Sequence, residues 1–173
     1  MIFTACFILN VTTINAQEKC SYDVNKADPM TGKQHRVINI PIKLMGILQT
    51  VGAWGIQLER LGDDFSITSR LVLGTNVIDN LEKGDSLILK IESGKIITVY
   101  AKNRVAPKPL NQPNESPSTL FESVYPITAA DFKLMSLGKV LFVRSNVSSH
   151  VYDHEIKDKA AIKLQKAAVC ILL

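Results

Sequence analysis

The fold is decided by the stretch WGIQLERLGDDFSITSRLVL, residues 54–73. Apolar residues alternate with polar ones on both sides of a central turn, namely Trp54, Ile56 and Leu58 before it and Phe65, Ile67, Leu71 and Leu73 after it. A period of two residues is typical of a β-strand with one buried face. Because the two runs are separated by Gly62-Asp63-Asp64, the stretch predicts a β-hairpin.

A second hairpin follows in residues 87–100. The apolar residues Leu87, Leu89 and Ile91 occupy every second position and predict one strand. Residues 92–95 predict a turn, and residues 96–100 predict a second strand that runs back along the first. Two hairpins in succession favour an antiparallel meander that has one buried face and one solvent-exposed face. Residues 36–44 predict a further strand, which Pro41 places at a sheet edge or at a bulge because proline lacks a backbone donor.

The last third of the chain mixes strands and helices. Residues 121–125 and 139–144 predict strands. Between them a short helix begins at Thr128, whose hydroxyl is a good N-cap, and ends at Gly138.

A final helix is predicted over residues 153–172, with Asp153 as its cap. One face carries apolar residues, whereas Lys157, Lys163 and Lys166 lie outside. The expected fold class is α+β: an antiparallel β-meander of about five to seven strands with a short helix and a C-terminal helix packed on the sheet.

The N-terminus is typical of an exported protein. Residues 1–16 contain no charged residue, end in a small residue, Ala16, and are followed by the polar residues Gln17-Glu18-Lys19. This pattern predicts a signal peptide cleaved after Ala16 and a single α+β domain over residues 17–173. The alternatives are an N-terminal core strand and a lipobox ending at Cys6; a transmembrane anchor would need about 20 continuous apolar residues.

Two cysteines remain after removal of residues 1–16. Cys20 and Cys170 stand near the two ends of the mature chain. In an oxidising compartment two cysteines indicate one disulfide, which here would tie the termini together. The alternative is that Cys170 is an ordinary buried thiol on a helix face.

The net charge and the distribution of basic residues limit the classes of binding partner that we expect. The net charge is only +4, and the basic residues are scattered without an arginine-rich helix or a stacking motif, so nucleic acid is not an expected partner. An envelope protein, or an anionic glycan or lipid, is compatible with this charge. The proline-rich loop 102–118 is the candidate binding loop, with Lys102, Arg104 and Lys108 at its basic flank.

One motif suggests catalysis. Gly84-Asp85-Ser86-Leu87 resembles the signature of the GDSL esterases, which would make Ser86 a nucleophile. In that family the serine follows a strand, whereas here the apolar strand comes after Ser86, and the family's Gly-x-Asn-Asp block is missing. We therefore favour a turn that opens a strand. Asp85-Ser86-Leu87 also resembles an O-glycosylation acceptor, which requires an exposed Ser86.

Two histidines have a spacing that some metal sites use. His150 and His154 stand at i and i+4, which places both imidazoles on one face if the segment is helical. The predicted helix begins only near Asp153, however, so His150 precedes it. We expect exposed histidines around a helix start, with no metal and no cofactor.

The chain as a whole resembles small, uncharacterised exported proteins of Bacteroidetes-type bacteria. The resemblance lies in Cys20-Ser21-Tyr22-Asp23, in the strand 84–90 and in the helix ending at Cys170. It implies a periplasmic or cell-surface location and no chemistry. We therefore expect a non-enzymatic binding or accessory module of the cell envelope, the alternative being a small serine hydrolase that uses Ser86.

Overall fold

The computed structural model describes residues 20–43, 51–74, 77–110 and 117–173 of the chain. These residues contain ten strands and two helices, and all strand pairs are antiparallel. The α+β class predicted from the sequence is confirmed, and the strands are more numerous than the five to seven expected. The predicted signal peptide, residues 1–16, lies outside the described residues.

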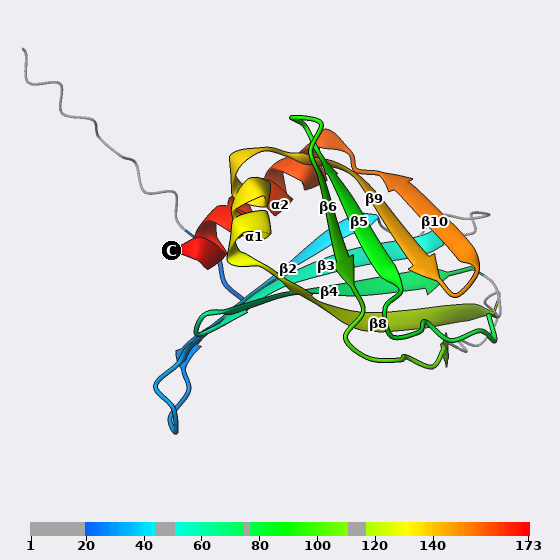
Figure 1. Cartoon of the computed structure of the whole chain (residues 1–173), viewed down its shortest axis with the longest axis horizontal. Helices are drawn as coiled ribbons and strands as arrows, with labels where there is room; N and C mark the ends of the chain where they lie inside the picture. Colours follow the sequence, from blue (N-terminus) through cyan, green and yellow to red (C-terminus); the bar gives the residue numbers. More distant parts are fainter. Residues whose placement is uncertain (1–19, 44–50, 75–76, 111–116) are drawn as a thin grey trace, which may run out of the picture.

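The strands form two sheets, which Figure 1 shows as two layers with both helices at one end. The six-stranded sheet, in the order β1-β2-β3-β4-β8-β7, contains β1 (Val24–Ala27), β2 (Gln34–Lys43), β3 (Val51–Leu61), β4 (Asp64–Leu73), β7 (Lys108–Leu110) and β8 (Ser118–Ile127). The four-stranded sheet, in the order β10-β9-β5-β6, contains β5 (Ser86–Ile91), β6 (Ile96–Tyr100), β9 (Val140–Val147) and β10 (His150–Glu155). One hydrophobic core joins both sheets and both helices.

The hairpin predicted over residues 54–73 is confirmed as β3 and β4. Leu58 lies opposite Ile67 in the register, and both are fully buried. Gly62 in the turn has a φ of +62°, a left-handed conformation that glycine adopts without steric cost. The alternation in the sequence therefore sets which face of this sheet meets the core.

Pro41 has both properties predicted for it. β1 pairs only with the first part of β2, from Gln34 to Val37, so Pro41 lies on a stretch of β2 that is free on one side. The pairing of β2 with β3 also shifts register between Pro41 and Lys43. A residue without a backbone donor fits such a position because no ladder hydrogen bond is lost.

The second predicted hairpin is also confirmed, as β5 and β6, but it belongs to the other sheet. Leu87 and Leu89 face the core and are fully buried. β5 continues its pairing on its other side with β9, and β9 pairs with β10. The two hairpins thus lie in separate layers rather than in one continuous meander.

Helix α1 (Ala129–Leu137) begins as predicted. The Thr128 hydroxyl accepts a hydrogen bond from the Asp131 amide at 3.1 Å and donates one to the Asp131 carboxylate at 2.8 Å. Gly138 ends the helix, with a φ of −155°, which is extended backbone open to any residue. A Cβ at this position would lie 2.9 Å from Cγ2 of Ile91, so the close approach of β5 requires the glycine.

The predicted start of the last helix was wrong. Residues 150–155 form β10 instead, and α2 (Asp158–Leu172) begins after Lys157. Pairing with β9 along six residues provides hydrogen bonds that an isolated first helical turn could not match. The predicted packing is confirmed, since α2 lies against β2 and β3 and buries Leu164 and Ile171.

Candidate functional site

The disulfide between Cys20 and Cys170 is present, and the predicted pairing is confirmed. The two Cα atoms are 5.6 Å apart, and the bridge spans 150 residues of sequence. Beside it, the Tyr22 hydroxyl donates a hydrogen bond to the backbone oxygen of Cys170 at 2.7 Å. The segment before β1 is therefore attached to α2 by one covalent and one polar link.

Ser86 lies at the start of β5, and its contacts are those of a structural residue. Its side chain is only 9% exposed, and its hydroxyl accepts a hydrogen bond from the Asn146 amide group at 2.8 Å. No histidine of the described residues shares a hydrogen bond with it. The exposure that O-glycosylation requires is absent at Ser86 in this structure.

His150 and His154 lie on β10 and not around a helix start, which corrects the expectation. Burial lowers the pKa of His154, and the positive charges of Lys43 and Lys157 lower it further. His150 is exposed and has its Nδ1 atom 3.8 Å from a carboxylate oxygen of Asp79. Within the described part of the chain no cluster of three or more His, Cys, Asp or Glu side chains could hold a metal ion.

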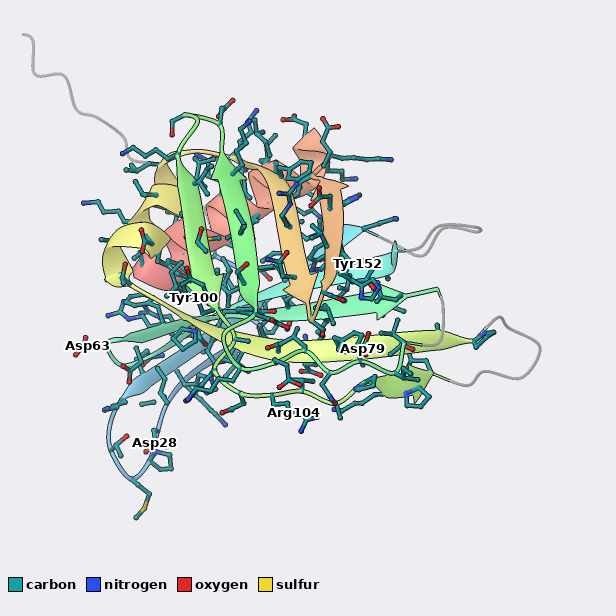
Figure 2. All side chains as sticks on the ribbon, turned by 45° about the vertical axis from the view of Figure 1, so that its right-hand side comes forward. Asp28, Asp63, Asp79, Tyr100, Arg104 and Tyr152 are labelled. Carbon is teal, nitrogen blue, oxygen red and sulfur yellow. A yellow bond between two sulfur atoms is a disulfide. The ribbon has the colours of Figure 1, made fainter. Side chains whose placement is uncertain are left out.

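The cations of the candidate binding loop are exposed but not gathered. The amide of Lys102 bonds to Val124, whereas Lys108 lies opposite Leu120 in the register of β8. Four residues along a strand separate the two backbones by about 13 Å. Arg104, labelled in Figure 2, forms an ion pair with Glu82 at 3.1 Å.

A groove of about 410 Å³ lies beside the disulfide. Cys20, Asn39, Lys163 and Lys166 line it together with Asp23. The Asp23 carboxylate already accepts hydrogen bonds from the backbone and side chain of Asn39, at 2.6 and 3.1 Å. Two positively charged side chains thus border this groove, and the predicted anionic partner stays a prediction.

The outer face of the four-stranded sheet is the most unusual surface of the described chain, and Figure 2 views it from the front. It consists of three rows of side chains, each row taking one residue from β6, β5, β9 and β10 in that order: Ile96, Lys90, Phe142 and Glu155; Thr98, Ile88, Arg144 and Asp153; Tyr100, Ser86, Asn146 and Val151.

Large apolar side chains on this outer face are open to solvent. Ile96 is 64% exposed, Tyr100 59%, Val151 58% and Leu141, beside Phe142, 37%. A depression of about 380 Å³ lies among Ile88, Ile96, Leu141 and Phe142, with Lys90, Arg144 and Glu155 at its margin. Such neighbouring exposed apolar groups with a polar margin are typical of an interaction surface.

The charges on the outer face differ in how they are paired. Arg144 forms a bidentate ion pair with Asp153, in which its Nε and Nη2 atoms donate to the two carboxylate oxygens at 2.6 and 2.7 Å. These hydrogen bonds lower the pKa of the Asp153 carboxyl. Lys90 and Glu155 form no ion pair with any described residue. They stand on either side of Phe142 in the same row.

The sequence reasoning missed this face, although a signal was present. Residues 96–97, 99–100 and 140–143 are apolar at consecutive positions, so these strands do not alternate strictly. A strand with apolar residues on both faces is buried on both faces in most proteins. Here one face meets the core and the other is open to solvent.

Comparison with protein-family models, with curated proteins and with solved structures gives no match for this chain.

Proposed function

We propose that this chain is an exported, non-enzymatic binding module of the cell envelope that docks its partner on the outer face of the four-stranded sheet. The observation that carries the proposal is the exposure of four large apolar side chains on this one face, of which Ile96 and Leu141 line the depression and Tyr100 and Val151 stand at the other end of their strands. Water contact at four large apolar groups is unfavourable, by roughly 25 cal/mol for each Å². A partner that covers them recovers this free energy.

The disulfide supports the location. Bridges such as Cys20–Cys170 persist in oxidising compartments and are rare in the cytosol. None of the described helices is long and apolar enough to cross a membrane. The disulfide agrees with export by a cleaved signal peptide, which the sequence of residues 1–16 predicts.

The architecture supports docking rather than a mobile binding loop. The exposed apolar residues stand on paired strands whose opposite faces are fixed in the core by Leu87, Leu89 and Val143. A rigid surface loses little conformational entropy on binding, so more of the contact free energy appears as affinity.

Photo-crosslinking tests the docking face. A p-benzoylphenylalanine residue replaces Leu141, or Ile96, in the protein expressed in its native host. The matched control places the same residue at Leu137, which is exposed on α1 and lies off the face. We expect discrete adducts from positions 141 and 96 and none from position 137. Equal adducts from all three positions, or none from any, would contradict the proposal.

The location is tested by the mass of the protein recovered from that host. We expect a chain that starts at Gln17 and whose thiols react with an alkylating reagent only after reduction. A chain that keeps residues 1–16 and has free Cys20 and Cys170 thiols would refute export. The docking face could then still be correct, because the crosslinking result is independent of the compartment.

A further inference from the structure

We propose that the occupant of the outer face is a second copy of this chain, related by a two-fold axis that runs parallel to the strands between β9 and β5. The inference rests on the proposed docking face. Face-to-face sheets in proteins pack about 10 Å apart with their strands nearly aligned, and an axis in this direction produces that arrangement.

The axis brings exposed apolar residues of the two copies together at one end of the face. Rotation about it exchanges β6 with β10 and β5 with β9 and leaves each row in place. Tyr100 then meets the partner's Val151, and Val151 meets the partner's Tyr100. The two side chains are exposed to nearly the same extent, 59% and 58%. Their burial against each other removes the two large apolar groups at the ends of one row from water.

Under the same rotation Lys90 gains an aromatic partner and an opposite charge, while Glu155 lies opposite the partner's Ile96. Lys90 lies over the ring of the partner's Phe142, where a cation is attracted by the π-face. One strand further on, the partner's Glu155 comes within reach of the flexible Lys90 side chain. These are the two charges of the face that have no ion pair among the described residues.

No remaining charge lies directly opposite another charge, and Arg144 stands one strand from the partner's Arg144. Arg144 faces the partner's Ile88, and Asp153 faces the hydroxyl of the partner's Thr98. Arg144 and Asp153 keep their own ion pair, so neither enters the interface as a lone charge. A closed two-fold contact requires one surface that matches itself, and the facing pairs Tyr100–Val151 and Lys90–Phe142 provide such matches.

The size of the face sets the expected affinity. Four strands and about six residues per strand cover roughly 19 by 20 Å. This projected area, roughly 380 Å², is less than half of the about 800 Å² that a standard specific interface buries on each partner, so the contact is of the weak, transient class. The dimer is therefore expected to dissociate between the micromolar and the millimolar range, where its equilibrium can be measured directly.

A charge exchange tests the proposal by sedimentation equilibrium of the purified protein with its disulfide intact. Lys90→Glu and Glu155→Lys should each raise the dimer dissociation constant by about tenfold, because each places like charges together. The double variant Lys90→Glu/Glu155→Lys should return it close to the wild-type value. Lys133→Glu, with the same charge change on α1, is the control and should have no effect. Circular dichroism confirms that each variant is folded.

Crosslinking of a cysteine pair tests the position of the axis. Tyr100 and Val151 are three strands apart in one chain, about 14 Å, whereas the facing pair in the dimer is about 10 Å apart. Tyr100→Cys/Val151→Cys should therefore form covalent dimers with a short bismaleimide. Each single variant should form none, since its two copies are about 17 Å apart across the axis.

The outcomes separate this inference from the proposed function. A protein that stays monomeric at millimolar concentration, or a dimer whose dissociation constant is the same in all charge variants, overturns the second copy as occupant. If photo-adducts at Leu141 then contain a different protein, the docking face stands and its occupant is foreign. If the adducts are absent as well, both proposals fail.

Discussion

The carboxylate of Asp85 holds the amide of Ser148, 63 residues further along the chain, in a hydrogen bond of 2.8 Å. The same carboxylate oxygen accepts the amide of Glu82, also at 2.8 Å. Asp85 therefore joins the turn before β5 to the turn between β9 and β10, where Ser148 has a φ of +54°. Asp85 of the Gly84-Asp85-Ser86-Leu87 motif thus fixes one end of the four-stranded sheet.

Replacement of Asp85 by alanine should lower the free energy of unfolding by about 1–3 kcal/mol, because two backbone amides lose a charged acceptor. Asp85→Asn should cost less, since its side-chain oxygen can still accept. The matched control is Asp63→Ala, at an exposed turn position for which no hydrogen bond is seen among the described residues. Urea unfolding measures all three, and equal losses for Asp85→Ala and Asp63→Ala would contradict the role of Asp85.

Gly138→Ala should destabilise the protein by about 1–3 kcal/mol through overpacking. Its new methyl group would lie 2.9 Å from Cγ2 of Ile91, a buried β-branched side chain that has little freedom to move.

Gly55→Ala is the control for this substitution, because its methyl group would meet its nearest neighbours at 3.9 Å. That variant should keep the wild-type stability or gain up to about 1 kcal/mol from a less flexible unfolded chain. Thermal unfolding compares the two variants. A Gly138→Ala protein as stable as the Gly55→Ala protein would show that α1 and β5 can move apart freely.

The sequence was sufficient for the hairpins and insufficient for their assembly. Alternation over residues 54–73 and 87–91 specified three strands and their buried faces, and the turn at 92–95 specified the fourth strand, since a strand exposes every second residue. No local sequence pattern predicts that β4 pairs with β8 or that β5 pairs with β9. Those partners are set by contacts between distant segments, and they divide the strands into two sheets.

The misassigned segment 150–155 shows the limit of local patterns. His150-Val151-Tyr152-Asp153-His154-Glu155 carries an aspartate where a helix cap is favourable, and it alternates too weakly to indicate a strand. Pairing with β9 and the Arg144–Asp153 ion pair decide in favour of β10. The outer face escaped prediction for a related reason. Its residues come from four strands, and only the register brings Lys90, Phe142 and Glu155 into one row.

His154 should make the protein less stable as the pH falls from about 7 to 5. Burial and the charges of Lys43 and Lys157 hold its pKa below the ordinary value of 6.5, with Glu155 opposing them. Below pH 6.5 the unfolded chain therefore binds more protons than the folded one, and the free energy of unfolding falls.

The variant His154→Gln should show a shallower decrease over this range than the wild type, while the two proteins should respond alike between pH 7.5 and 8.5. Chemical unfolding at each pH measures the difference. Identical slopes for variant and wild type below pH 7 would show that His154 does not titrate differently on folding.

Loss of the Cys20–Cys170 bridge should lower the free energy of unfolding by about 2–5 kcal/mol, since a long loop is released in the unfolded chain. Cys20→Ala/Cys170→Ala should match the reduced wild type in urea unfolding and should not respond to reductant. The Tyr22 hydrogen bond to Cys170 remains available in both, so Tyr22→Phe added to the double variant separates the polar link from the covalent one. If reductant leaves the unfolding midpoint of the wild type unchanged, the bridge contributes no stability and the segment before β1 is held by its other contacts.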